Sequence, residues 1–277
     1  MEIEQIVIEA LKGTKQVHDE LGSGGEKLVA KNQFGETALK VDIEAEKAVL
    51  DTLKKHSVPI AVISEEHGTV YLVKNPLYIG ILDGLDGSRL YKKMRGKSEY
   101  GTMFAIFENR SLLAYEDYIV GGVMQHATDK LFLVSRGKGS HVLEGDKQSP
   151  IQTSQQRKLV SDTRIYVDEC CNVNKKFFSE RLKGHDIKCL KCSALYYVDV
   201  ASGAADLALE CTRKGNLEIA VAYGLIKEAG GVMVTMDGRS IGRQNYYTFG
   251  QREHIPIITA ATKDLADNVI RHLNKSA

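Results

Sequence analysis

The sequence predicts an α/β fold in which layers of helix and sheet pack on one another. Of its 277 residues, 43% are hydrophobic and 26% are charged, which is typical of a globular protein. Segments with apolar residues at helical spacing are interleaved with short apolar runs that read as strands. This interleaving favours layered packing. The length suits one domain or two close lobes.

The first part of the chain reads as two helices and then a series of strands. Apolar residues at helical spacing predict a helix over residues 3–21, and we expect the glycine-rich residues 22–25 to be a flexible connection. Asp42 is expected to cap a second helix that carries Ala45 and Val49 on one face. Strands are predicted at residues 60–63, 77–82, 101–107, 118–124, 130–135 and 141–143, the last two as a hairpin.

In the rest of the chain, predicted strands and helices alternate more regularly. A polar stretch from Ser149 to about Lys158 is interpreted as the boundary between two lobes, about residues 1–150 and 151–277. After it, strands are predicted at residues 159–167, 187–190, 206–210, 232–235 and 255–260, and helices at residues 175–182, 193–201, 217–229 and 262–273.

Charge and cysteine content narrow the class of protein. The chain has 37 Lys and Arg against 36 Asp and Glu, and a net charge of +1 argues against a nucleic acid polymer as partner. No apolar run approaches the ~20 residues that cross a membrane, and the acidic start does not resemble a signal peptide. We therefore expect a cytoplasmic protein with reduced cysteines. Cys189 and Cys192 form a C-x-x-C without a second half, which we interpret as structural or incidental.

The most informative stretch is an acidic turn, Asp83-Gly84-Leu85-Asp86-Gly87-Ser88, directly after a predicted strand. Two neighbouring aspartates suit a hard divalent cation. Residues 89–93 read as the beginning of a helix, and a helix start offers free N–H groups to an anion such as phosphate. Together these features indicate metal-dependent phosphoryl chemistry. The alternative is simple turn chemistry, because Asp-Gly is a common turn dipeptide.

Further carboxylates stand at the ends of other predicted elements. Glu65 and Glu66 follow an apolar strand, and Glu218 opens a helix. Taken singly, the two glutamates could lie in a solvated loop, and Glu218 could serve only the helix dipole. If Glu65, Asp83, Asp86 and Glu218 converge, each close pair costs ~4 kcal/mol in repulsion at an effective dielectric near 20. Only a bound cation makes such a cluster reasonable.

In order and approximate spacing these motifs resemble the inositol monophosphatase family, which also contains fructose-1,6-bisphosphatases and nucleotide 3'-phosphatases. That family carries Glu-Glu after a strand, then Asp-Pro-[Ile/Leu]-Asp-Gly-[Ser/Thr], then Trp-Asp opening a helix that ends Glu-Ala-Gly-Gly. The corresponding residues here are Glu65-Glu66, residues 83–88, Leu217-Glu218 and residues 228–231. The resemblance covers nearly the whole chain. Residues 34–42 and 64–68 look most like the archaeal branch, which acts on inositol monophosphate and fructose bisphosphate.

The resemblance implies a set of metal ligands and catalytic residues. Glu65, Asp83 and the carbonyl of Leu85 would hold a first Mg²⁺ ion. Asp83, Asp86 and Glu218 would hold a second, and Glu36 could lie near a third. Glu65 and Ser88 would orient a metal-bound water as the nucleophile.

The resemblance also implies how the substrate is held. The N–H groups of Gly87 and Ser88 would hold the phosphate, and Ser193 and Glu210 would meet sugar or cyclitol hydroxyls. Lys188 and Arg213 are candidates for a second phosphate. The complete substrate-binding set implied is Asp86, Gly87, Ser88, Lys188, Ser193, Glu210 and Arg213.

The sequence thus leads to an expected function. We expect the αβαβα sugar-phosphatase fold, a homodimer, and a Mg²⁺-dependent phosphomonoesterase acting on inositol monophosphate and/or fructose 1,6-bisphosphate. The alternatives are a nucleotide 3'-phosphatase and a catalytically weak, ligand-binding regulatory relative. Three residues depart from the family pattern: Gly84 replaces a proline, which should loosen the turn, Leu217 replaces a tryptophan, and Glu218 replaces an aspartate.

Overall fold

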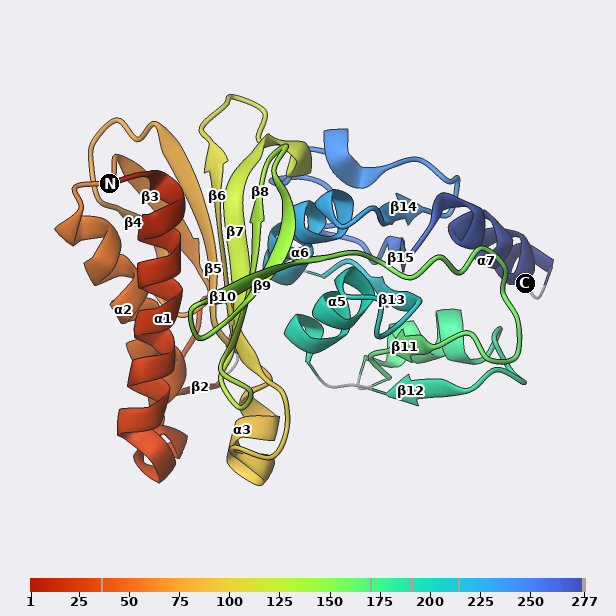
Figure 1. Cartoon of the computed structure of the whole chain (residues 1–277), viewed down its shortest axis with the longest axis horizontal. Helices are drawn as coiled ribbons and strands as arrows, with labels where there is room; N and C mark the ends of the chain where they lie inside the picture. Colours follow the sequence, from red (N-terminus) through yellow and green to blue (C-terminus); the bar gives the residue numbers. More distant parts are fainter. Residues whose placement is uncertain (36, 170, 190–191, 214, 276–277) are drawn as a thin grey trace.

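The computed structural model describes residues 1–35, 37–169, 171–189, 192–213 and 215–275. Over these residues the helices and sheets form alternating layers in the order αβαβα, which confirms the predicted fold class (Figure 1). The outer helices α1 (Ile3–Leu21) and α2 (Lys40–Lys55) cover one face of the first sheet. The central helices α5 (Ser193–Ala201) and α6 (Leu217–Glu228) lie between the two sheets, and α7 (Lys263–Lys275) covers the far face of the second sheet.

The first sheet places the segments that carry Glu65 and Asp83 next to each other, at the ends of neighbouring strands. Its strands are β3 (Ile60–Ser64), β4 (Gly68–Tyr71), β5 (Tyr78–Asp86), β6 (Gly101–Glu108), β7 (Tyr118–Gln125), β8 (Lys130–Ser135), β9 (Gly139–Glu144) and β10 (Lys147–Ile151). They lie in the order β10-β9-β8-β7-β6-β5-β3-β4, and only β3 and β5 run parallel. Ser64 pairs with Leu82, so Glu65 and Asp83 leave the two strands side by side.

The second sheet positions the start of α6. Its strands are β11 (Ile165–Val167), β12 (Ile187–Cys189), β13 (Leu207–Cys211), β14 (Val232–Thr235) and β15 (Pro256–Ala260), in the order β12-β11-β13-β15-β14. Helix α6 begins six residues after β13 ends, and Asn216, in the left-handed conformation with φ 47°, turns the chain into it. This sharp return carries Arg213 and Glu218 back toward the first sheet.

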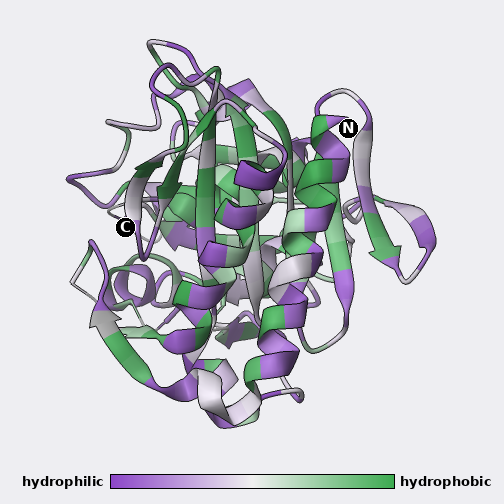
Figure 2. Ribbon diagram, turned by 90° about the vertical axis from the view of Figure 1, so that its left-hand side faces the viewer, coloured by the Kyte–Doolittle hydropathy of each residue, from purple (hydrophilic) through white to green (hydrophobic). Residues whose placement is uncertain are grey.

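Apolar packing explains why the helices lie on the sheets. Ile6, Val7 and Leu11 of α1 are buried against the first sheet together with Val49 and Leu53 of α2. Figure 2 views this face, where the helices in front carry many purple hydrophilic residues and the strands behind them are largely green. The core between the sheets includes most of α6, whose residues are buried on nearly every side. A helix buried on all sides needs an apolar sequence throughout, as α6 has.

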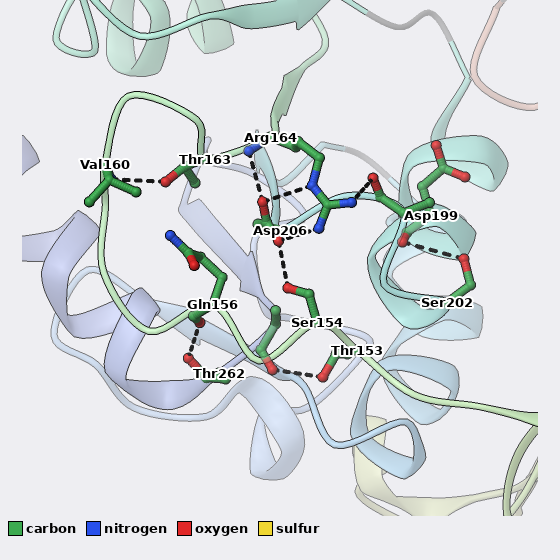
Figure 3. A network of polar contacts seen from close by, with 12 residues as sticks. Thr153, Ser154, Gln156, Val160, Thr163, Arg164, Asp199, Ser202, Asp206 and Thr262 are labelled. Atoms are coloured by element: carbon green, nitrogen blue, oxygen red, sulfur yellow. Dashed lines mark hydrogen bonds and ion pairs between the residues drawn. The ribbon is translucent and has the colours of Figure 1, made fainter.

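Polar contacts hold the segment that leads from the first sheet to the second, residues 152–164, against the second sheet (Figure 3). Asp206, which is buried directly before β13, accepts hydrogen bonds from Ser154 Oγ and from the guanidinium of Arg164, whose Nη2 lies 2.7 Å from Asp206 Oδ1. Thr153 Oγ1 donates to the carbonyl of Ala261 over 2.8 Å. The expected division into two lobes near residue 150 stays a proposal, because the layer of α5 and α6 packs on both sheets.

Several predicted bounds were wrong. The strand predicted at residues 159–167 is only β11, because Val160 N–H donates to Thr163 Oγ1 and forms a turn before it. The helix predicted at residues 175–182 is a short α4 (Asn172–Asn174) followed by a π-helical turn (Lys175–Ser179). Residues 22–25 lie in a 3₁₀ helix (Gly22–Glu26) rather than a loose connection.

A few short strands were not predicted at all. They are β1 (Leu28–Lys31), β2 (Thr37–Leu39), β4 and β10. β10 includes Pro150, which is tolerated because the strand lies at a sheet edge. The polar boundary segment predicted from Ser149 therefore begins inside a strand. Among the described helices, none is long and apolar enough to span a membrane.

Candidate active site

The parallel ends of β3 and β5 meet the start of α6 at a pocket of about 630 Å³. Its lining includes most of the residues that the sequence predicted for catalysis and metal binding. It also includes several that the sequence did not predict: Thr37, Arg89, Asp168 and Cys171. The lining residues predicted from the sequence are Glu65, Asp83, Leu85, Asp86, Gly87, Ser88, Arg213 and Glu218.

Three carboxylates form the centre of this pocket. One carboxylate oxygen from each of Asp83, Asp86 and Glu218 lies within 4.8 Å of the other two. Asp83 is buried, and its Oδ1 accepts the N–H of Leu85 over 2.9 Å. Asp86 accepts the N–H of Ala194 at the start of α5. These hydrogen bonds fix the carboxylates on rigid elements from both sides of the pocket.

The charges in this cluster repel one another. Burial and the neighbouring Glu218 raise the pKa of Asp86 to about 7. Burial, followed by repulsion from Glu65, also raises the pKa of Asp83, and burial with Glu218 raises that of Glu65. An array of hard carboxylate oxygens that repel one another fits a divalent cation such as Mg²⁺.

Among the described residues, Arg213 is the cation that forms an ion pair with this cluster. Its guanidinium donates to Glu218 and, over 3.3 Å, to Ser193 Oγ, and the nearby Glu218 raises the pKa of Arg213. A single guanidinium cannot balance four carboxylates. The donor set therefore still fits a metal ion in addition to this ion pair.

Ser88 lies at the edge of the acidic cluster, next to Asp42. Its Oγ is 3.2 Å from Asp42 Oδ1 and 3.0 Å from the carbonyl oxygen of Leu85. Asp42 was expected to cap α2, and its side chain does so, but from the first turn of the helix. The helix begins at Lys40, so Asp42 lies inside the first turn, where its Oδ2 accepts the N–H of Leu39 over 2.6 Å. Burial raises the pKa of Asp42 to about 7.

Glu46, one turn further along α2, is a second residue that sequence reasoning missed. It is fully buried and accepts hydrogen bonds from Ser64 Oγ, from the N–H of Glu66 and from His67 Nδ1, the last over 2.7 Å. It thereby fixes the turn that carries Glu65. The signal was present, because Asp42 and Glu46 stand at helical spacing on the buried face of an amphipathic helix.

The remaining predicted substrate residues divide into two groups. Ser193 and Glu210 are buried and are absent from the pocket lining, although Arg213, which lines the pocket, donates to Ser193 Oγ. Glu210 Oε1 has no hydrogen-bond partner among the described residues, and burial raises the pKa of Glu210 to about 8. Lys188 is exposed on the edge strand β12 and is absent from the pocket lining, so the structure does not bring it to the site. Glu36 lies outside the described residues.

The two cysteines of the C-x-x-C have different surroundings. Cys189 is exposed, whereas Cys192 is buried with its thiol 3.4 Å from Asp86 Oδ2. Burial, followed by the charge of Asp86, raises the pKa of Cys192, so the thiol stays protonated and donates to that carboxylate. Cys192 thus supports a site residue from behind.

Comparison with known proteins agrees with this geometry. The sequence model of the inositol monophosphatase family matches residues 1–277. The bifunctional NADP phosphatase/NAD kinase of Methanococcus maripaludis is 28% identical over 220 residues, which cover 75% of this chain and 38% of that longer protein. The fructose-1,6-bisphosphatase/inositol-1-monophosphatase of Methanothermobacter thermautotrophicus is 26% identical over 213 residues, covering 73% and 72% of the two chains.

Solved structures share the fold. An IMPase from Thermotoga maritima superposes with a TM-score of 0.76 at 19% identity, covering 100% of this chain and 98% of that one. The match to the family over the whole length shows that the chain belongs to the inositol monophosphatase family of phosphomonoester hydrolases.

Proposed function

We propose that the protein is a Mg²⁺-dependent phosphomonoesterase that hydrolyses a small sugar or cyclitol phosphate, inositol monophosphate and/or fructose 1,6-bisphosphate. The observation that carries this proposal is the close approach of Asp83, Asp86 and Glu218 in a pocket that Glu65 and Ser88 also line. The substrate class is supported by the name of the Methanothermobacter thermautotrophicus relative.

The metal ligands that we propose are those that the family resemblance implies, and all of them line the pocket. Glu65, Asp83 and the carbonyl of Leu85 would hold one ion, and Asp83, Asp86 and Glu218 a second. When bound, Mg²⁺ ions would neutralise charge on the phosphate and lower the pKa of water. A third ion near Glu36 stays an expectation from the sequence.

The protein's own residues can orient the attacking water. Ser88 Oγ carries one hydrogen, which it can donate to ionised Asp42. A lone pair of Ser88 is then free to accept a hydrogen from water. Glu65, which accepts a hydrogen bond from Asn32 Nδ2 over 3.2 Å, can accept the other. Two fixed acceptors define the direction in which the oxygen lone pair points toward phosphorus.

The substrate contacts are proposed on the same basis. Ser88 begins helix α3 (Ser88–Met94), so its N–H has no partner within the helix and can donate to phosphate together with the N–H of Gly87. Arg213 lines the pocket and donates to the buried Ser193, and we propose that these two residues, with the buried Glu210, meet hydroxyls of the alcohol. A homodimer and a cytoplasmic location remain proposals, for which light scattering and cell fractionation are the tests.

Phosphate release from a panel of esters tests the function. The panel is inositol 1-phosphate, fructose 1,6-bisphosphate and adenosine 3',5'-bisphosphate, each with Mg²⁺ and with a chelator. We expect release with Mg²⁺ and none with the chelator. Undiminished turnover in the chelator would contradict the metal mechanism. Metal binding without release from any ester would favour the regulatory alternative.

A further inference from the structure

The hairpin of β1 and β2 brings its tip to the active site. Among the described strands, β1 and β2 pair only with each other and form a two-stranded sheet. Lys31 pairs with Thr37 across the turn, and Thr37 lines the active-site pocket. The described residues of the tip, 32–35, therefore lie beside the pocket, and the contacts of the tip determine how the hairpin sits against the site.

Asn32 is the buried residue of this tip, with 8% of its surface exposed. Its amide makes a hydrogen bond from each end. Nδ2 donates to Glu65 Oε1 over 3.2 Å, and Oδ1 accepts the N–H of Phe34 over 3.0 Å. A backbone N–H only donates, and an ionised carboxylate only accepts, so both bonds form in a single orientation of the amide. Asn32 therefore contacts Glu65 in one defined way.

The Asn32 amide also acts on the neighbouring carboxylate. Burial, followed by repulsion from Asp42 and Glu46, raises the pKa of Glu66 to about 8. A hydrogen bond from Asn32 acts in the opposite direction and favours the charged form of Glu66. The amide thus offers hydrogens to both glutamates that follow β3. A neutral donor stabilises their charge without placing a cation where a metal ion would bind.

Phe34 holds the tip against the turn that leads into α6. A Cβ at Gly215 would lie 2.7 Å from Phe34 Cζ, so the ring rests directly on the glycine backbone. Gly215 has a φ of 95° and precedes Asn216, the residue that turns the chain into α6. The tip therefore contacts Glu65 through one residue and the entry to α6 through another. Glu218, in the first turn of α6, belongs to the same acidic cluster.

We propose that Asn32 is a positioning residue for the phosphatase reaction, which fixes the Glu65 carboxylate in the orientation that holds a metal ion and accepts a hydrogen from water. Phe34 keeps Asn32 in place by packing on Gly215. This inference rests on the proposed function, because it takes the role of Glu65 from there. In the described part of the chain, Asn32 is not among the residues that line the pocket, so it acts through Glu65 and not on the substrate.

Two substitutions at position 32 separate positioning from turn formation. Asn32→Ser keeps an oxygen that can accept the N–H of Phe34, but it is too short to reach Glu65. Asn32→Gln keeps an amide donor for Glu65, but its longer side chain fits the turn less well. We expect Asn32→Ser to lower kcat for inositol 1-phosphate about tenfold with little change in KM, and Asn32→Gln to lie closer to wild type. The opposite order would show that Asn32 serves only the turn.

Mg²⁺ binding, measured by calorimetry, is a readout that does not depend on turnover. We expect Asn32→Ser to weaken it about tenfold. Gln33→Ala is the matched control, since Gln33 lies in the same tip but donates to the carbonyl of Ser64, over 2.6 Å, and not to a carboxylate. We expect Gln33→Ala to keep the kcat and the Mg²⁺ affinity of the wild type. Equal losses in Gln33→Ala and Asn32→Ser would mean that any loosening of the hairpin has this effect, and would overturn the specific role of Asn32.

A double variant tests the support from Phe34. Phe34→Ala should cause a smaller loss of the same kind as Asn32→Ser, and the Phe34→Ala, Asn32→Ser double variant should be no slower than Asn32→Ser alone. Additive losses would overturn the link between Phe34 and Asn32.

The two readouts also separate a failure of this inference from a failure of the proposed function. Ester hydrolysis by the wild type, with unchanged kcat and Mg²⁺ affinity in Asn32→Ser, would overturn the positioning role and leave the phosphatase intact. Weaker Mg²⁺ binding by Asn32→Ser than by wild type and Gln33→Ala, without hydrolysis of any ester, would leave the positioning of Glu65 intact and overturn the phosphatase.

Discussion

Gly84 lies so close to Asp42 that a Cβ at position 84 would come within 2.4 Å of the Asp42 carbonyl oxygen and 2.7 Å of Glu46 Cγ. The sequence interpretation, that glycine loosens a turn which proline would stiffen, is therefore incomplete. Gly84 lies within β5, and its small size is what allows α2 to approach the acidic turn. Asp42 reaches Ser88 only because of this approach.

We expect Gly84→Ala to destabilise the protein. A methyl group forced against a backbone carbonyl typically costs ~1–3 kcal/mol of unfolding free energy. Urea unfolding followed by circular dichroism measures this cost. Gly24→Ala is the control, because no heavy atom lies within 4 Å of a Cβ at position 24. Equal unfolding free energies for the two variants would show that α2 can move away from Gly84 at no cost.

The sequence could predict the parts of the site that depend on local pattern. Asp83 and Asp86 at a strand end and Glu218 at a helix start were recognisable, and the structure brings them together. It could not predict the role of Asp42 or Glu46, because a carboxylate on a buried helix face makes sense only beside partners distant in sequence. For Glu46 those partners come from residues 64–67.

Two further predictions failed, one because of a local contact and one because of the order of strands in a sheet. The predicted strand began at the apolar Leu159 and Val160, but the Thr163 side chain offers the backbone a competing turn. Lys188 was assigned to a phosphate by its place in the sequence, whereas β12 lies at the edge of the second sheet, away from the pocket. Sheet order is a long-range property, and a single strand does not reveal it.

Asp42→Asn should lower kcat with little change in KM, because Asp42 acts through Ser88 rather than on the substrate. Removing the carboxylate that accepts the hydrogen of Ser88 should lower the rate of hydrolysis roughly 10²-fold or more. Ser88→Ala should have a similar effect, Ser88→Thr should retain activity, and the Asp42→Asn, Ser88→Ala double variant should be no slower than either single variant. Steady-state kinetics test this, and additive losses would mean that the two residues act separately.

His126 links the acidic turn to a buried polar cluster. Thr102 Oγ1 donates to the carbonyl of Gly84 over 2.7 Å and lies 3.0 Å from His126 Nε2. The hydroxyl has one hydrogen, so His126 must donate from Nε2, and its Nδ1 has no partner among the described residues. His18 stacks on the ring at 4.8 Å. Burial, followed by the charges of His18 and Lys15, lowers the pKa of His126 well below its usual range.

We expect His126 to make the protein acid-sensitive. Because its pKa is lower in the folded state, the unfolded chain binds more protons, and unfolding free energy falls as pH drops below about 6.5. Buried carboxylates with raised pKa values act in the opposite direction, so the comparison must be with a variant. The stability difference between wild type and His126→Gln, measured by urea unfolding at several pH values, should shrink from pH 7.5 to pH 5. A difference that does not vary with pH would contradict the prediction.

Asp83→Asn should separate metal binding from folding. Asp83 is buried among like charges, so its neutralisation should raise the melting temperature in chelator. Added Mg²⁺ should stabilise the wild type by mass action but not the variant, and phosphate release by the variant should be nearly lost. Thermal unfolding with and without Mg²⁺ measures both effects. A variant that Mg²⁺ stabilises as much as wild type would mean that Asp83 is not a ligand.

Glu218 has a longer side chain than the aspartate of the family pattern. Its carboxylate makes contacts on two sides. It bonds to Arg213 and also places an oxygen among those of Asp83 and Asp86. Shortening it to aspartate removes one carbon–carbon bond, about 1.5 Å, from a side chain that is fixed in the first turn of α6. Two outcomes are conceivable: either the site is fitted to the longer side chain, or the longer side chain holds the second ion weakly.

The structure favours the fitted site, because Glu218 reaches Arg213 and the cluster at once. Glu218→Asp should therefore slow turnover and raise the Mg²⁺ concentration for half-maximal activity about tenfold, which corresponds to ~1.4 kcal/mol. Glu218→Gln keeps the length but removes the charge, and should lose Mg²⁺ binding by calorimetry as well as activity. Turnover titrations with Mg²⁺ for wild type and Glu218→Asp decide between the two outcomes. Tighter Mg²⁺ dependence with faster turnover in Glu218→Asp would refute the fitted site and would mean that the natural glutamate weakens the enzyme.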